Sequence, residues 1–308
     1  MESFKNIPNK VITHYSISDN PYNSEITRTT PTAFVFLVDQ SESMKWEEIS
    51  IKGELKTKAE VVTDMINSIL DELVSRCQKS EGIRDYFDVC LIGYGGSSDG
   101  KSSVLWEGSL VGNTWVKISE LKENARFEKR QIVKNIRGVS KLSEVDVPYW
   151  ITATANYNTP MLDAIKKTFD ILKNWIDNGH EACFPPTVIN ITDGIYSDGT
   201  KEEMIQEATN LKALHTKDGS VLFLNCHITT NQSVSVIFPS SAKDLPVSET
   251  LAIDLFNMSS KMPIQYNRRI SEEIKNENDI RAEYIGMGYN TNMDDLFRLI
   301  DIGTTQAK

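Results

Sequence analysis

Hydrophobic positions along the chain follow two alternating patterns. Short, almost unbroken apolar runs rich in β-branched and aromatic residues start with TAFVFLVD at 32–39 and recur toward the end of the chain. Such runs are typical of strands buried on both faces of a parallel sheet. Between them, apolar residues return every three or four positions, which predicts amphipathic helices. We expect strands at 32–39, 86–95, 103–108 (an antiparallel edge), 186–194, 220–228 and 283–287, and helices at 55–77, from 159, 201–216, 248–258 and 293–302.

This alternation predicts a single large domain. Strands and helices that alternate in this way form a doubly wound α/β fold, with a mostly parallel central sheet and helices on both faces. We expect residues 1–31 to be an N-terminal extension and 32–308 to be one domain with an insertion at about 116–150. Within the insertion, 122–138 holds six basic and two acidic residues. A charge run of this kind is more typical of a solvated surface segment than of a partner-binding patch.

Composition narrows the classes of function. The chain has 308 residues, 40% of them hydrophobic, and a net charge of −10, which fits a soluble globular protein and argues against binding to nucleic acids or anionic membranes. No apolar run approaches a membrane span, and the N-terminus lacks the apolar region of a signal peptide, so we expect a cytoplasmic protein. The four cysteines show no C-x-x-C spacing and are expected to be reduced, buried thiols: Cys77, Cys90, Cys183 and Cys226.

Polar residues directly after the expected strands carry the candidate chemistry. The first strand ends in Asp39-Gln40-Ser41-Glu42-Ser43, and a later strand ends in Thr192-Asp193-Gly194. A third loop, Asn156-Tyr157-Asn158-Thr159, leads to Pro160, with Thr159 expected as the helix N-cap. The carboxyl ends of parallel strands meet at one edge of the sheet, and extended residues two apart project to the same side. Asp and Ser residues after a strand often do no more than form a turn or cap a helix. Three such loops at one edge of the sheet, however, favour a binding site. Its oxygen-only donors suit Mg²⁺ or Mn²⁺.

Three segments resemble the motifs of one known family. VFLVDQSESM is similar to the D-x-S-x-S motif that opens the metal-ion-dependent adhesion site of von Willebrand factor A domains. NTPMLDAI and INITDG resemble the second and third motifs of that family, and the likeness runs from about Thr32 to Thr304 and is greatest to bacterial stand-alone members. The resemblance implies that Ser41 and Ser43 bind the metal directly and that Thr159 binds it directly or through water. It implies that Asp39 and Asp193 lie just behind, holding metal-bound waters.

The same resemblance implies a function. Members of this family are non-enzymatic modules that capture an Asp or Glu of a partner protein on the metal. Similar bacterial proteins suggest a scaffold in signalling, stress response or defence, with kinases, phosphatases or defence components as partners. We expect Glu42, Tyr157, Asn158 and Gly194 to form the ligand face. Here the sequence departs from the family, because Glu42 replaces a frequent Gly and Tyr157-Asn158 replaces a frequent Gly-Gly.

Two enzymatic alternatives remain open at this stage. Gly96-Ser97-Ser98-Asp99-Gly100 matches the G-x-S-x-G pattern of hydrolases, with Ser98 as nucleophile. That nucleophile elbow needs a helix directly after it, whereas the following residues are expected to form a strand. A metal-dependent phosphotransferase would use Asp39 as nucleophile, but would be expected to carry a second Asp where Ser41 stands.

Overall fold

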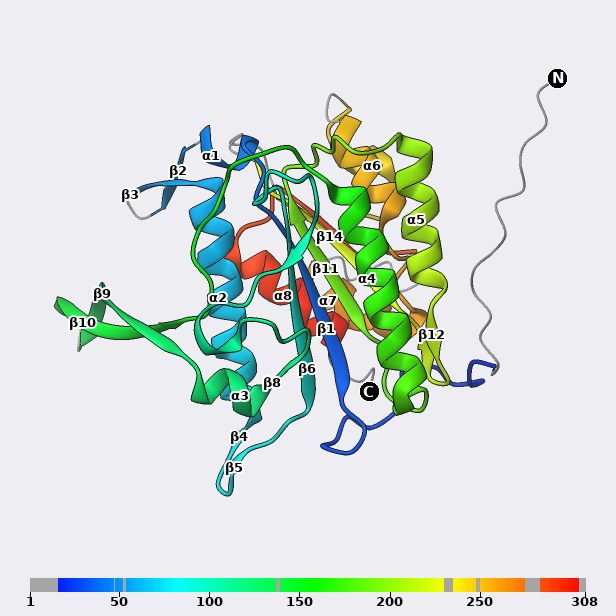
Figure 1. Ribbon diagram of the computed structural model, residues 1–308, viewed down its shortest axis with the longest axis horizontal. Helices are drawn as coiled ribbons and strands as arrows, with labels where there is room; N and C mark the ends of the chain where they lie inside the picture. The colour runs from blue at the N-terminus through cyan, green and yellow to red at the C-terminus, as the bar shows by residue number, and fades with distance from the viewer. Residues whose placement is uncertain are drawn as a thin grey trace.

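A central β-sheet runs through the molecule between two layers of helices in the computed structural model (Figure 1). The structure describes residues 16–46, 48–51, 54–136, 139–229, 235–247, 250–274 and 283–304. The strands of the main sheet in spatial order are β15 (Val236–Ile237), β16 (Met287–Tyr289), β14 (Leu222–His227), β11 (Thr187–Thr192), β1 (Thr32–Asp39), β6 (Phe87–Tyr94) and β7 (Ser103–Val104), with β8 (Val116–Lys117) also on β6.

The order of the strands creates a crevice next to β1. The strand β1 pairs in parallel with both β6 and β11, and β14 and β16 continue the parallel arrangement, whereas β7, β8 and β15 are antiparallel. This confirms the expected doubly wound, mostly parallel sheet. The chain goes from β1 to β6 on one side and later returns to β11 on the other. Ligands of such folds bind at the carboxyl ends of the strands where the order reverses, which here is between β1 and β11.

The alternation of side chains in β1 explains the two helix layers. Phe34 and Phe36 belong to one apolar core, and Val35 and Leu37 to the other, as expected for a strand buried on both faces. The first core contains residues of α2 (Lys58–Cys77), α3 (Ile118–Glu123), α7 (Asn267–Glu273) and α8 (Met293–Thr304). The second contains residues of α4 (Met161–Trp175), α5 (Lys201–Ala213) and α6 (Thr250–Met258).

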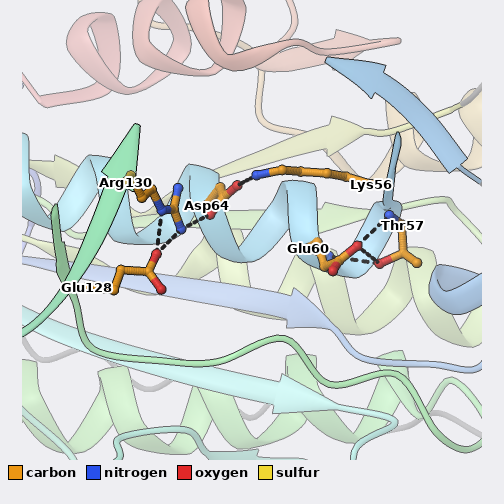
Figure 2. A network of polar contacts seen from close by, with 6 residues as sticks. All are labelled: Lys56, Thr57, Glu60, Asp64, Glu128 and Arg130. Atoms are coloured by element: carbon orange, nitrogen blue, oxygen red, sulfur yellow. Dashed lines mark hydrogen bonds and ion pairs between the residues drawn. The ribbon is translucent and has the colours of Figure 1, made fainter. Parts of the chain in front are cut away.

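Some expected element boundaries were wrong. The first long helix begins at Lys58 rather than 55, because residues 54–57 form β3 (Glu54–Thr57), antiparallel to β2 (Glu48–Ile51). The side chains of Thr57 and Glu60 form a capping box that fixes this start (Figure 2). The last strand is β16, so most of the expected strand 283–287 precedes it.

The segment that protrudes from the domain is shorter than the expected insertion at about 116–150. The side chains of Val116, Ile118 and Leu121 are fully buried in the core, so the first part of 116–150 belongs to the body of the domain. A long hairpin, β9 (Arg126–Ile136) with β10 (Val139–Tyr149), extends away from the body (Figure 1). Asp64 of α2 accepts from Arg130 Nη2 of β9 at 2.7 Å, which holds the hairpin to α2, and it also accepts from Lys56 Nζ of β3 at 2.6 Å (Figure 2).

Part of the expected N-terminal extension packs against the domain. Of the segment 1–31, residues 1–15 lie outside the described residues, and Tyr22 is buried against Phe184 and Tyr266. All four cysteines are free and buried. Among the residues that the structure describes, no helix combines the length and apolar character that a membrane span requires.

Candidate metal centre

The loop after β1 gathers three oxygen-bearing side chains. Asp39 is the last residue of β1 and is 1% exposed. Its Oδ1 accepts hydrogen bonds from the backbone nitrogen of Ser41 at 2.9 Å and from Ser41 Oγ at 2.6 Å. Ser41 Oγ lies 3.0 Å from Ser43 Oγ, where the short helix α1 (Ser43–Trp46) begins. The structure therefore brings Asp39, Ser41 and Ser43 together as the D-x-S-x-S pattern predicts.

The end of β11 is attached directly to this loop. Thr192 Oγ1 donates to Asp39 Oδ2 at 2.6 Å and accepts from the backbone nitrogen of Gly194 at 2.9 Å. Asp193, between these two residues, is 8% exposed. The hydroxyl of Thr192 thus positions both carboxylate-bearing loops, a role that sequence reasoning missed although Thr192 directly precedes the predicted Asp193.

Backbone pairing brings the third loop to the same place. Tyr157 forms a parallel bridge with Ser41, and the backbone nitrogen of Glu42 donates to the carbonyl of Tyr157 at 2.9 Å. On its other side, the backbone nitrogen of Tyr157 donates to the carbonyl of Gly95, directly after β6, at 2.9 Å. Thr159 follows two residues later and is 4% exposed. The loop that carries Thr159 therefore continues the edge formed by the loop of Asp39.

The start of α4 differs from the expected N-cap. Thr159 is not the N-cap, because Pro160 takes that position without a side-chain cap. The carboxylate of Asp198 instead accepts from the backbone nitrogens of Leu162 at 3.0 Å and Asp163 at 2.8 Å. An anion is favoured at a helix N-terminus, which explains why this distant carboxylate caps the helix. The hydroxyl of Thr159 is consequently not needed for capping.

The expected ligand-face residues separate into two groups. Glu42 and Asn158 are exposed, and Tyr157 is 49% exposed. Gly194, in contrast, is buried, and a Cβ placed on it would lie 3.1 Å from Leu251 Cβ. Gly194 therefore does not face solvent, whereas the other three residues do.

A buried lysine that the sequence did not reveal contacts the site. Lys58 Nζ lies 2.8 Å from Asp193 Oδ2, and the side chains of Lys58 and Asp193 are only 5% and 6% exposed. Lysine is rarely buried without a charged partner. The first residue of α2 thus places a positive charge directly on one of the two candidate metal carboxylates.

Among the residues that the structure describes, no lysine or arginine is a main contributor to the electrostatics of Asp39. Burial, together with the charge of Asp193, raises the pKa of Asp39 to about 7, although hydrogen bonds from Ser41 and Thr192 lower it. A buried carboxylate of this kind favours a nearby cation.

The donor chemistry fits a hard divalent cation. The five predicted residues offer two carboxylates and three hydroxyls, and hard divalent cations prefer oxygen ligands. Within the described ranges, no group of three or more His, Cys, Asp or Glu side chains has an arrangement that could hold a metal. A centre built from the five predicted residues would instead be rich in hydroxyls.

Ser98 does not have the surroundings of a hydrolase nucleophile. It is exposed in a turn between β6 and β7. The chain continues into a strand rather than the helix that a nucleophile elbow requires. The G-x-S-x-G match at 96–100 therefore lies in a different local structure from that motif.

Comparisons with known proteins give a limited result. No family model matches the chain, and no curated protein matches it. A solved structure described as "von Willebrand factor type A from Catenulispora acidiphila" is similar over 70% of this chain, with 13% sequence identity and a TM-score of 0.40. The match spans 43% of that longer chain.

His227 provides a pH test of the packing beneath the site. Its ring is 3% exposed, stacks on Tyr289 at 5.0 Å, and its Nε2 lies 3.1 Å from the carbonyl oxygen of Asp193. Burial lowers the pKa of His227 from 6.5 to about 4. The unfolded chain therefore binds a proton at higher pH than the folded chain. We expect His227 to remove stability as the pH falls from 6.5 toward 4, by about 3 kcal/mol.

Urea unfolding in EDTA at a series of pH values measures this effect. We expect the free energy of unfolding of His227→Phe to fall less steeply between pH 6.5 and 4 than that of the wild type. The carboxylates titrate in both proteins, so the difference between the two profiles isolates His227. Parallel profiles would show that His227 is not held neutral by burial.

Proposed function

We propose that this chain is a non-enzymatic protein-binding module of the von Willebrand factor A type that depends on a divalent cation, Mg²⁺ or Mn²⁺. The observation that carries the proposal is the convergence of Asp39, Ser41 and Ser43 with the end of β11 at the strand-order reversal. The bound cation would offer a coordination position to a carboxylate of a partner protein.

The roles of the five residues follow from their chemistry. Ser41 and Ser43 contribute neutral hydroxyl oxygens to the cation, and Thr159 contributes a third. Asp39 accepts from the Ser41 hydroxyl, which leaves lone pairs of that hydroxyl oxygen available. Asp39 and Asp193 contribute two negative charges without filling the coordination sphere of a divalent cation, and Lys58 beside Asp193 adds one positive charge. The site then retains attraction for one further anionic ligand.

The surface around the site favours an acidic partner only through the cation. The chain carries a net charge of −10, and the exposed Glu42 lies in the loop between Ser41 and Ser43. An Asp or Glu of a partner is therefore repelled unless a cation reverses the local sign. We infer a cytoplasmic scaffold role in signalling, stress response or defence, with partners such as kinases, phosphatases or defence components.

Capture of partners from native lysate tests this function. We expect the immobilised wild-type chain to retain a partner in Mg²⁺ and to release it in EDTA. The double variant Ser41→Ala, Ser43→Ala should lose at least about 90% of the captured protein, because two of the proposed metal ligands are removed.

Ser98→Ala is the matched control for this experiment. It removes the same hydroxyl group from an exposed turn outside the site, and we expect it to capture the partner as well as the wild type. Metal-independent capture by the double variant would contradict the proposal. Loss of capture in Ser98→Ala would instead show that the turn at Ser98 takes part in partner binding.

A further inference from the structure

Lys58 occupies a position where a positive charge needs a specific reason. It is the first residue of α2, at the positive end of the helix dipole, which disfavours a cation. Its side chain is also almost completely removed from water, which disfavours an isolated charge. The carboxylate of Asp193, 2.8 Å from Lys58 Nζ, offsets these costs.

The neighbouring lysine shows that this placement is selective. Lys56, two residues earlier, directs its ammonium group to Asp64 at 2.6 Å, and Asp64 also contacts Arg130 (Figure 2). That network joins α2 to the base of the hairpin and remains partly exposed, with the Lys56 side chain at 26%. Two lysines close in sequence thus serve different carboxylates.

We propose that Lys58 is an internal cation of the metal site, which competes with the divalent cation for Asp193. The inference rests on the proposed function, because it assumes that Asp193 belongs to a metal site. When no divalent cation is bound, the ammonium group neutralises Asp193 and keeps the end of β11 from holding an unpaired buried charge.

The competition follows from charge. A divalent cation that approaches Asp193 meets either the ammonium group itself, which must move, or its repulsion at a distance of a few ångströms. In both cases Lys58 lowers the affinity for metal. The same positive charge near a loaded site increases the attraction for an acidic ligand. Lys58 therefore lowers the affinity for metal. In return, it stabilises the site when no metal is bound and favours a carboxylate ligand when metal is bound.

Calorimetric titration of the full chain with Mn²⁺ alone tests this inference. We expect Lys58→Gln to bind Mn²⁺ at least about tenfold more tightly than the wild type, because the competing charge is gone. Lys56→Gln is the matched control. It removes the same charge two residues earlier in the chain, from a lysine that contacts Asp64 rather than Asp193. We expect its Mn²⁺ affinity to remain close to that of the wild type.

Thermal melting gives a second readout that does not depend on metal binding. In EDTA, Lys58→Gln should melt several degrees below the wild type, because Asp193 is left buried without its partner. Saturating Mn²⁺ should reduce or reverse that difference. Lys58→Met, which keeps the apolar stem of the side chain, replaces Lys58→Gln in both measurements if the latter is not stable enough to purify.

The outcomes separate this inference from the proposed function. Equal or weaker Mn²⁺ binding by both Lys58 variants, with clear binding by the wild type, would overturn the role of Lys58 and leave the metal site intact. No binding by the wild type or by any variant would overturn both. Binding by the Lys58 variants but not by the wild type would support the competition and contradict metal dependence of the native chain.

Discussion

Asp39→Asn is expected to abolish stabilisation by metal. Saturating Mg²⁺ or Mn²⁺, at about 100 times its dissociation constant, should stabilise the wild type by about 2.7 kcal/mol, or about 4 °C in Tm. An asparagine keeps the shape of Asp39 but removes one of two charges that balance the cation. We therefore expect no metal-dependent rise in Tm for this variant, measured by thermal unfolding with and without EDTA.

Without metal, the same substitution should change the stability of the protein in the opposite direction. A carboxyl whose pKa is raised to about 7 contributes stability that is present below its unfolded pKa of 3.8 and is lost as the pH rises through 7. At pH 8 the buried carboxylate of Asp39 therefore costs up to about 4 kcal/mol. Asparagine avoids that charge but loses part of the hydrogen bonding to Ser41 and Thr192. We expect Asp39→Asn in EDTA at pH 8 to be at least as stable as the wild type.

Opposite effects with and without metal distinguish a metal ligand from a purely structural carboxylate. A structural role for Asp39 predicts that the variant loses stability under both conditions. An unchanged metal-dependent rise in Tm would contradict the assignment of Asp39 to the metal site.

Gly95→Ala is expected to disrupt the site through the backbone. Gly95 has φ +96°, and a Cβ on it would lie 2.6 Å from the backbone nitrogen of Ser41 and 2.8 Å from the carbonyl oxygen of Asn158. These are backbone atoms of two of the three loops, so they cannot move aside independently of the site. We expect a loss of about 2–4 kcal/mol from left-handed strain and overpacking together.

Gly100→Ala separates these two causes. Gly100 also has positive φ, +67°, but no atom lies within 4 Å of a Cβ placed on it. Its substitution should cost only about 1 kcal/mol and leave Mn²⁺ affinity unchanged. Gly95→Ala should lower both the free energy of unfolding, measured in urea, and the affinity for Mn²⁺. Equal effects of the two substitutions would show that the close approach of Gly95 to Ser41 is unimportant.

The central architecture could be predicted because its signals are local. The run 32–39 contains apolar side chains for both helix layers, so its burial is visible in the sequence itself. The D-x-S-x-S spacing likewise predicts which of its side chains share one side, and the hydrogen bonds among Asp39, Ser41 and Ser43 bear this out.

What could not be predicted depends on contacts between distant residues. Lys58 resembles any surface lysine at a helix start until Asp193, 135 residues later, lies beside it. The cap of α4 comes from Asp198, 36 residues after Leu162, so the local Thr159-Pro160 signal was misleading. The hairpin strands 126–136 and 139–149 mix charged and apolar residues without strict alternation, and their cross-strand pairs appear only once the register is known.

The central position of β1 has a consequence for synthesis of the protein. Thr192 and Asp39 lie 153 residues apart in sequence, yet β11 is one of the two neighbours of β1 in the sheet. A nascent chain must therefore carry this edge of β1 unpaired while about half of the polypeptide, from β1 to β11, is translated. Fragments that end before Thr187 expose this edge, and exposed apolar edges promote association between chains. Truncated forms of this protein should accumulate as aggregates rather than as smaller folded domains.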